Sequence, residues 1–202
     1  ISVGTLHSCA ALVGGAVQCW GHNGDGRLGD GTTVDALVPT DVAARSEMTS
    51  VATAGPGGLS ARHTCGLYAD GRVGCWGANS NGQLGHVVAD PALTPSVVGA
   101  VIDLAFVSTG VGADPSTDPS AALSTGSAHG CATIAGEWDE GAFCWGSNGV
   151  GQIGLPTAQQ AKPLGYLVPG LGNARRVVAG SLHTCAAMAD RTVWCMGRNS
   201  KG

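Results

Sequence analysis

Eight cysteines in four close pairs constrain the fold of this 202-residue chain more than any other feature. A short segment separates the two cysteines of each pair, and long cysteine-free stretches separate the pairs. The pairs are Cys9–Cys19, Cys65–Cys75, Cys131–Cys144 and Cys185–Cys195. An even number of cysteines in local pairs predicts four disulfide bonds, and such bonds persist in oxidising compartments.

Each cysteine pair is predicted to close one β-hairpin. Pairing Cys65 with Cys75 leaves 69–71 as a three-residue loop in which Gly71 takes the left-handed position. Arg191 stands at this position in the fourth unit, so that turn either tolerates a strained arginine or changes type. A non-hydrogen-bonded antiparallel pair holds its Cα atoms about 4.5 Å apart, which is within disulfide range. A ring of this length contributes slightly under about 3 kcal/mol.

A metal site is the alternative use of these cysteines. A histidine precedes the first cysteine of every pair by two residues, and residues i and i+2 of a strand share a face; these are His7, His63, His129 and His183. A His–Cys–Cys set nevertheless lacks a fourth zinc ligand in every unit, and no C-x2-C pair occurs. Disulfides are therefore favoured over zinc, and we expect neither a metal nor a cofactor.

The cysteine pairs mark a repeat with a period of about 59 residues. A short β-like segment precedes each hairpin, and a glycine-spaced turn, a proline and another apolar stretch follow the first three. The β-like segments are 1–4, 49–55, 104–110 and 175–180. Four strands per unit predict the blades of an all-β propeller. The predicted repeats, within a single portion 1–202, are approximately 1–48, 49–100, 101–172 and an incomplete 173–202.

Composition excludes several classes of partner. Charged residues make up 12% of the chain, the net charge is −4, and the ten lysines and arginines are scattered. We therefore expect no nucleic-acid partner. No apolar run approaches the roughly 20 residues that span a bilayer, so direct membrane insertion is not expected. The chain opens at Ile1 without a basic n-region or cleavage site, so any targeting segment is expected to lie outside it.

The repeat resembles the regulator of chromosome condensation repeat. The resemblance rests on segments such as ARHTCGLYADGRVGCWG (61–77) and NSNGQLG (79–85). They follow that family's pattern G-x-x-H-[ST]-C-A-L … D-G-x-V-x-C-W-G-x-N-x-x-G-Q-L-G, and the match covers nearly the whole chain. The resemblance implies a seven-bladed propeller, of which this chain holds about three and a half blades. We therefore expect a portion of a longer polypeptide, or half of a ring that another copy completes.

The paired cysteines depart from the best-known members of that family. Those members are intracellular, exchange guanine nucleotide on a small GTPase and bind chromatin, and they do not pair cysteines in each blade. The cysteine-paired form looks instead like the repeats of secreted or surface-tethered bacterial proteins, among which similar propellers are binders and enzyme inhibitors. This resemblance implies an extracellular, periplasmic or cell-surface location.

Residues that recur in every unit are interpreted as architectural, because a catalytic residue is needed only once. The four histidines are expected to support the blades through hydrogen bonds. Trp20, Trp76 and Trp145 directly follow the second cysteine and are expected to pack between blades. Asp25 and Asp30 lie in a glycine-spaced turn whose spacing does not fit a calcium loop, so we predict an ordinary turn.

Residues that do not recur are the candidates for function. The tip of the third hairpin places Trp138 among the carboxylates Glu137, Asp139 and Glu140 on a predicted surface loop. These four residues are the candidate partner-binding site, since exposed tryptophans at loop tips often anchor interfaces. The alternative is that Trp138 folds back over an insertion at 111–126 that precedes the hairpin.

The other unrepeated polar residues form no constellation. Asp114 and Asp118 lie in the insertion, whose content of Pro, Ser and Ala indicates a solvated loop rather than a calcium site. Four further residues are assigned to ordinary surface: His22, His86, Arg175 and Arg176.

The chain contains no nucleophile elbow, phosphate-binding loop, dinucleotide fingerprint or zinc-protease motif, so no enzyme is expected and no catalytic residue is assigned. The predicted function is a non-enzymatic extracellular propeller that binds a protein or a surface polymer through loops on one rim. The alternative is a structural subunit of a larger extracellular or membrane-associated assembly. An enzyme inhibitor, a hydrolase with a site in the central channel and a guanine nucleotide exchange factor are less favoured. Exchange in particular conflicts with disulfides, which do not persist in reducing cytosol.

Overall fold

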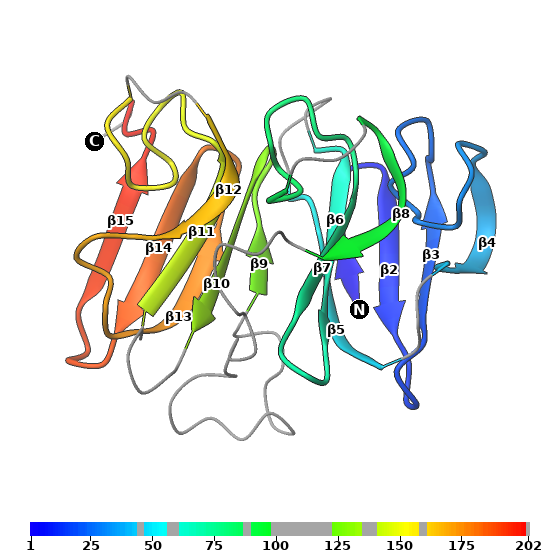
Figure 1. Cartoon of the computed structure of the whole chain (residues 1–202), viewed down its shortest axis with the longest axis horizontal. Coiled ribbons are helices and arrows are strands. Elements are labelled where there is room, and N and C mark those ends of the chain that lie inside the picture. The colour runs from blue at the N-terminus through cyan, green and yellow to red at the C-terminus, as the bar shows by residue number, and fades with distance from the viewer. Residues whose placement is uncertain are drawn as a thin grey trace.

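The chain folds into consecutive antiparallel sheets that stand side by side. The computed structural model describes residues 1–43, 47–55, 61–86, 90–97, 123–134, 141–157 and 161–200. Within these ranges three sheets have four strands and the last sheet has three. Figure 1 shows them in chain order, from the N-terminal sheet on the right to the C-terminal sheet on the left. The predicted all-β partial propeller is therefore confirmed, and we call the four sheets blades 1 to 4.

Each blade is ordered as its strands follow one another in the chain. Blade 1 contains β1 (Ser2–Val3), β2 (His7–Ala11), β3 (Val17–Gly21) and β4 (Ala36–Asp41). Blade 2 contains β5 (Met48–Thr53), β6 (His63–Tyr68), β7 (Val73–Gly77) and β8 (Ala92–Val97). Blade 3 contains β9 (Leu123–Thr125), β10 (His129–Ile134), β11 (Gly141–Ser147) and β12 (Ala161–Leu167). Blade 4 contains β13 (Ala174–Ala179), β14 (His183–Met188) and β15 (Val193–Gly197). No helix that could cross a membrane occurs in the described part of the chain.

The first strand of blade 3 lies later in the chain than predicted. The sequence placed it at 104–110 and treated 111–126 as an inserted loop, but Leu123–Thr125 pairs with β10. Gly126 N donates to His129 O at 2.8 Å, and the same contact joins this strand end to the hairpin histidine in blades 1 and 4. Both 104–110 and 111–126 end in Ser-Thr-Gly, and Gly126 belongs to the second of these segments. The segment 104–110 itself lies outside the described residues.

A disulfide joins the two strands of every hairpin. The bonds are Cys9–Cys19, Cys65–Cys75, Cys131–Cys144 and Cys185–Cys195. In each hairpin the two cysteines are direct partners in the strand register, with their Cα atoms 4.1 Å apart. Since no cysteine of the chain is free, the sulfurs serve as covalent cross-links and not as zinc ligands.

The last residue of each three-residue hairpin loop lies in the left-handed region. That residue is Gly15 (φ 84°) in blade 1, Gly71 (φ 85°) in blade 2 and Arg191 (φ 72°) in blade 4, and in blade 1 the preceding Gly14 also has a positive φ of 99°. Arg191 N donates to Met188 O at 3.1 Å, as Gly71 N does to Tyr68 O at 3.0 Å. The fourth turn therefore keeps its type, and its arginine adopts a conformation that is unfavourable for L-residues.

Replacing Arg191 with glycine is expected to raise the free energy of unfolding by about 0.5–1 kcal/mol. The left-handed conformation costs an L-residue about 1–2 kcal/mol, and the larger unfolded-state entropy of glycine offsets part of this gain. Urea denaturation followed by circular dichroism measures the change. The reciprocal Gly71→Arg variant is expected to lose a similar amount, and two variants with unchanged stability would contradict this account.

The hydrophobic core lies between blades and not within them. One buried cluster joins blades 1 and 2 and includes Leu28 and Met48. A second joins blades 2 and 3 around Phe143, and a third joins blades 3 and 4 around Ile153. A blade thus buries both of its wide faces only when a neighbour stands on each side, which explains the scarcity of charge in the sequence.

Candidate functional site

Hydrogen bonds from a hairpin histidine connect blade 1 to blade 2. His7 Nε2 lies 2.8 Å from Thr64 Oγ1, and Thr64 Oγ1 donates to Arg27 O at 2.9 Å. Because the Thr64 hydroxyl donates its hydrogen bond to this carbonyl, its oxygen accepts a hydrogen bond from His7 Nε2. We call this arrangement the histidine relay: a histidine, the hydroxyl directly before the first cysteine of the next blade, and a turn carbonyl of the histidine's own blade.

The histidine relay recurs between blades 3 and 4. His129 Nε2 lies 2.9 Å from Thr184 Oγ1, which donates to Gln152 O at 2.8 Å. All of these side chains are buried. The prediction that the histidines support the blades through hydrogen bonds is therefore confirmed for His7 and His129.

The tryptophan after the second cysteine makes the other contact between blades. Trp76 Nε1 donates to Arg27 O and Trp145 Nε1 to Gln83 O, both at 2.9 Å. Each indole lies in the same buried cluster as the disulfide of the preceding blade. The predicted packing between blades is confirmed for Trp76 and Trp145, and each of them covers a disulfide.

Burial holds the hairpin histidines in the neutral form that the relay requires. Desolvation lowers the pKa of His7 to about 3, with the charge of Arg27 adding to the effect. Desolvation also lowers the pKa of His63 to about 3 and that of His129 to about 4, and neighbouring histidines lower both further. A general base that works near neutral pH needs a much higher pKa, so these histidines are suited to structure and not to acid–base chemistry.

The junction between blades 2 and 3 lacks the relay. Gly130 stands where Thr64 and Thr184 stand, and a Cβ there would meet Trp145 Cε2 at 2.6 Å, so the indole fills the space of the missing side chain. His63 is 0% exposed, and neither of its ring nitrogens makes a hydrogen bond of normal geometry; a weaker interaction with the backbone of His129 offsets only part of the lowering of its pKa. The expectation that all four histidines donate hydrogen bonds is therefore wrong for His63. The glycine before Cys131 in the sequence is the signal that could have revealed this.

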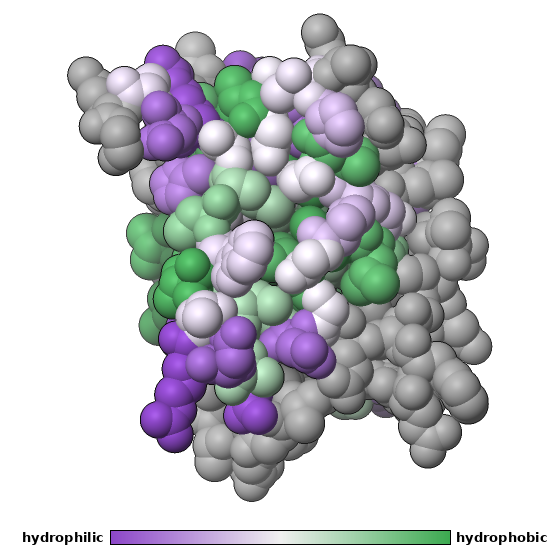
Figure 2. Space-filling view, turned by 90° about the vertical axis from the view of Figure 1, so that its left-hand side faces the viewer, coloured by the Kyte–Doolittle hydropathy of each residue, from purple (hydrophilic) through white to green (hydrophobic). Residues whose placement is uncertain are grey.

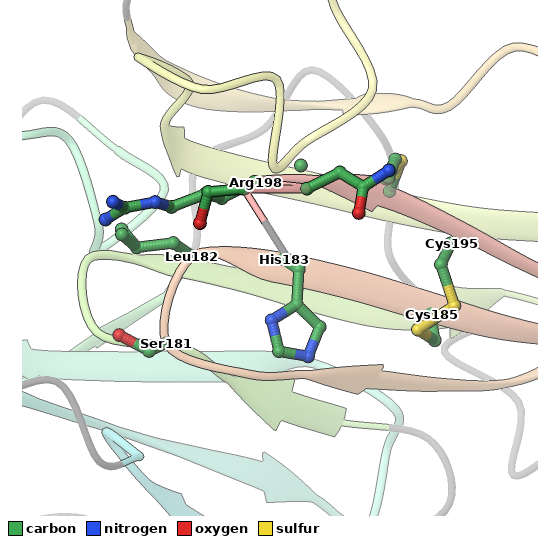
Figure 3. A pocket seen from close by; sticks show the side chains of 10 residues that line it. Ser181, Leu182, His183, Cys185, Cys195 and Arg198 are labelled. Atoms are coloured by element: carbon green, nitrogen blue, oxygen red, sulfur yellow. A yellow bond between two sulfur atoms is a disulfide. The ribbon is translucent and has the colours of Figure 1, made fainter. Parts of the chain in front are cut away.

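The corresponding surface of blade 4 is exposed among the residues that the structure describes. His183 and Cys195 are exposed, whereas the other three disulfides are 0% exposed. A hollow of about 600 Å³ on this surface is lined by Ser181, Leu182, His183, Cys185, Cys195, Met196, Gly197, Arg198, Asn199 and Ser200. Figure 3 shows the His183 ring on β14 and, further along that strand, the Cys185–Cys195 bridge that joins β14 to β15. We call this surface the open face.

The open face is apolar at its centre and polar at its margins. Figure 2, which views this end of the molecule, shows green and white side chains across the middle and purple ones above and below. Val178 and Val193 are 51% and 67% exposed. Val178 is the register partner of Cys185, and Val193 lies two residues before Cys195 on the same face of β15. The equivalent surfaces of the other blades are apolar in the same way, and a neighbouring blade packs on each of them.

The sequence-predicted partner-binding residues are not part of this surface. Glu137, Trp138, Asp139 and Glu140 follow the end of β10 and lie outside the described residues, as do Asp114 and Asp118 in the insertion. The structure therefore neither places them nor brings them together with the open face.

The structure also describes three polar residues discussed in the sequence analysis, the turn residues Asp25 and Asp30 and the histidine His86. Asp25 pairs with Arg27 and Asp30 Oδ1 accepts from Thr32 N at 2.9 Å, so both serve an ordinary turn as predicted. His86 is 6% exposed and not ordinary surface, because its ring nitrogens contact a turn carbonyl and the hydroxyl of Ser96 in β8, both at 2.6 Å.

The remaining surface assignments agree with the structure. His22, Arg175 and Arg176 are exposed. Within the described ranges, no group of three or more His, Cys, Asp or Glu side chains is arranged to hold a metal ion.

The stacked four-stranded blades define a β-propeller, and comparisons with known proteins identify its repeat. Residues 14–56 match the family model of the regulator of chromosome condensation (RCC1) repeat. Residues 59–83 and 174–202 match a second model of the same repeat. These matched segments, which lie in blades 1, 2 and 4, are therefore regulator of chromosome condensation repeats.

Relatives with this repeat are much longer than the chain. The ultraviolet-B receptor UVR8 of Arabidopsis thaliana is 30% identical over 208 residues, which cover 98% of this chain and 41% of the receptor. The E3 ubiquitin-protein ligase HERC2 of Homo sapiens is 27% identical over 203 residues, which cover 100% of this chain and 4% of the ligase. Among solved structures, yeast RCC1 bound to Kap60 superposes with a TM-score of 0.74 at 18% identity, covering 96% of this chain and 42% of that chain. The chain thus spans less than half of each of these relatives.

Proposed function

We propose that the chain is part of a non-enzymatic propeller that binds another protein outside the reducing cytosol, at an extracellular, periplasmic or cell-surface location. The observation that carries this proposal is a disulfide in every blade. Four such bonds survive only where thiols are not kept reduced. The cysteine-paired repeat of secreted bacterial proteins, to which this sequence is similar, has the same property.

The roles of the histidines support a non-enzymatic function. His7 and His129 are held in relays between blades, and His63 is sealed from solvent. Groups that are fully used in holding blades together are not available to substrate. This leaves the rims and the open surfaces for recognition.

Binding of a protein is favoured because the fold is used in this way elsewhere. The yeast RCC1 structure described above contains Kap60 as a bound partner. In the present chain we assign partner contact to the third hairpin tip, with Trp138 as the anchor and Glu137, Asp139 and Glu140 as its acidic surroundings. A large aromatic side chain ringed by polar groups is a common interface anchor.

A structural subunit of a larger assembly is the second candidate. It is favoured by apolar side chains on blade 1, where Leu37 and Val38 of β4 are 96% and 66% exposed. Broad contact with other subunits would cover such an edge.

The test compares two tryptophan variants of the tagged protein in the producing cells. After chemical cross-linking, the Trp138→Ala variant is expected to lose most of the product that joins the tagged protein to its partner, since truncation of an interface anchor commonly costs at least 2 kcal/mol of binding free energy. The thermal midpoint of this variant is expected to stay unchanged. Trp194→Ala is the matched control, because Trp194 is 59% exposed but lies in blade 4. Alkylation of the same samples without reductant reports the oxidation state.

Two results would overturn the proposal. One is recovery of the protein with alkylated cysteines, which places it in a reducing compartment. The other is an unchanged cross-linked species in Trp138→Ala, which removes the third hairpin tip from the binding site.

A further inference from the structure

Blade 2 contains a histidine–hydroxyl pair, His86 and Ser96, that does not follow the repeat. His86 comes directly after the glycine-spaced turn and is 6% exposed, and Ser96 lies in β8 and is half-buried. Asp30 takes the place of His86 in blade 1, and Leu155 takes it in blade 3. Blade 2 packs against a neighbour on both of its wide faces, so the exposure of Ser96 is that of a residue in a fully flanked blade. The pair is thus unrepeated and still reachable from solvent.

The hydrogen bonds of His86 decide which ring nitrogen carries the proton. Nδ1 lies 2.6 Å from the carbonyl oxygen of Leu84, which can only accept, so Nδ1 is the protonated nitrogen. Nε2 of the neutral ring is then an acceptor, and the Ser96 hydroxyl, 2.6 Å away, donates to it. The histidine relay runs in the opposite direction, because there the hydroxyl donates to a carbonyl and the histidine donates to the hydroxyl.

The turn that carries His86 is held in place from both ends. Asn79 Oδ1 accepts from Leu84 N at 3.1 Å, and Asn79 Nδ2 donates to His86 O at 3.2 Å. The Leu84 side chain is 0% exposed and lies in the cluster between blades 2 and 3. The Leu84 carbonyl therefore orients the imidazole toward Ser96, as the carboxylate orients the imidazole in a serine–histidine–aspartate triad.

The protonation state of His86 suits a base. Burial lowers the pKa of His86, and the bond to Leu84 O offsets part of this lowering. The ring is also less deeply buried than those of His63 and His129. Nε2 is therefore free of a proton at neutral pH and can take the proton of the Ser96 hydroxyl. A hydroxyl, a base and a group that orients the base, all at hydrogen-bond distance, are the arrangement of an activated nucleophile.

We propose that Ser96 is an acylation site that takes an acyl group from an activated carboxylic ester, such as an aryl ester or a thioester. Ser96 Oγ forms a bond to the carbonyl carbon of the ester while His86 Nε2 takes the hydroxyl proton. The bond from that carbon to the leaving oxygen or sulfur then breaks, and Nε2 returns the proton to the leaving group. The products are acyl-Ser96 and a free phenol or thiol.

The modification adds to the proposed binding function and does not require turnover. A serine alkoxide is a poorer leaving group than a phenolate or a thiolate, so acylation of Ser96 outpaces loss of the acyl group. One acyl group therefore accumulates on each chain. The reaction involves neither the third hairpin tip nor the compartment proposed above.

Treatment of the purified chain with p-nitrophenyl acetate at neutral pH tests the proposal. Peptide mass spectrometry follows the acetylated fractions of Ser96 and Ser147 with time. Ser147 is the internal comparison, because it is also half-buried but its oxygen accepts a hydrogen bond from Gln152 Nε2 at 3.1 Å. We expect acetylation of Ser96 to be about 10²–10⁴-fold faster, which is the effect of a positioned general base. In urea that unfolds the chain, this difference is expected to vanish.

The variant His86→Gln separates the base from the hydrogen bond. Its side-chain amide can still bond to Leu84 O or to Ser96 but has no basic nitrogen, so acetylation of Ser96 is expected to slow by about 10²-fold or more. The urea midpoint of this variant is expected to stay close to that of the wild-type protein. Ser147→Ala is the matched control and is expected to leave acetylation of Ser96 unchanged.

Three outcomes overturn the proposal. The first is a folded wild-type protein in which Ser96 is acetylated no faster than Ser147, which means that the bond to His86 only ties β8 to the turn. The second is a difference between the two serines that persists in urea. The third is a folded His86→Gln protein that is acetylated at the wild-type rate, which removes the imidazole from the reaction. The first two need no variant, and none of the three bears on Trp138→Ala, so failure here is distinct from failure of the proposed binding.

Discussion

Trp145→Ala is expected to lower the free energy of unfolding by about 3–5 kcal/mol, as truncations of large buried aromatic side chains do. Trp145 is 1% exposed, lies in the cluster between blades 2 and 3, and donates to Gln83 O. It also fills the space above Gly130, at the junction that has no histidine relay. Denaturation in urea, followed by far-ultraviolet circular dichroism, measures the loss.

Trp194→Ala provides the matched control for this prediction. The same chemical change at a side chain that is 59% exposed is expected to alter stability by no more than about 0.5 kcal/mol. A Trp145→Ala protein as stable as the control would show that blades 2 and 3 do not depend on this indole.

Acidification is expected to unfold the protein between about pH 6.5 and pH 4. The pKa of His7 and that of His63 are lowered from 6.5 to about 3 in the folded state, and that of His129 to about 4, mainly by desolvation. Below pH 6.5 the unfolded chain therefore binds protons that the folded chain does not. The stability that these histidines contribute is complete above pH 6.5 and is lost as the pH falls toward the folded values.

The expected size of this acid effect is large. Each histidine removes up to about 1.4 kcal/mol per pH unit, so the three together remove on the order of 8 kcal/mol by pH 4.5. That loss is comparable with the whole stability of an ordinary domain. Urea midpoints measured between pH 7.5 and pH 4.5 test it.

A pair of histidine variants separates burial from hydrogen bonding in this acid response. His63→Leu is expected to reduce the pH dependence by about a third and to change stability at pH 7.5 by no more than about 1 kcal/mol, because no hydrogen bond is lost. His129→Leu is expected to reduce the pH dependence to a similar degree but to lose about 1–3 kcal/mol at pH 7.5, because Thr184 is left without its donor. A pH-independent wild-type protein would contradict the proposed burial of these rings.

The parts of the fold that depend on local patterns could be predicted from the sequence. The hairpins, the turn that places Gly71 in the left-handed region and the packing of Trp76 all follow from spacing and alternation within a few residues. The repeated order of these patterns was enough to identify the blade and the propeller.

Features of the fold that depend on contacts with residues distant in the sequence could not be predicted from these local patterns. The isolation of His63 follows from Gly130, a residue 67 positions later in the chain, and the burial of His86 follows from Ser96 in an adjacent strand. The first strand of blade 3 was misplaced because two segments end in the same three residues, and only the bond to His129 distinguishes them.

The position of the hydrophobic clusters has a consequence for how such chains change in evolution. In the described part of the chain, each hydrophobic cluster is shared by two adjacent blades. A unit can therefore be duplicated, deleted or exchanged only if both wide faces of its blade pack well against the new neighbouring blades. A single repeat expressed alone is therefore expected to stay unfolded, because it lacks the neighbour that completes its core.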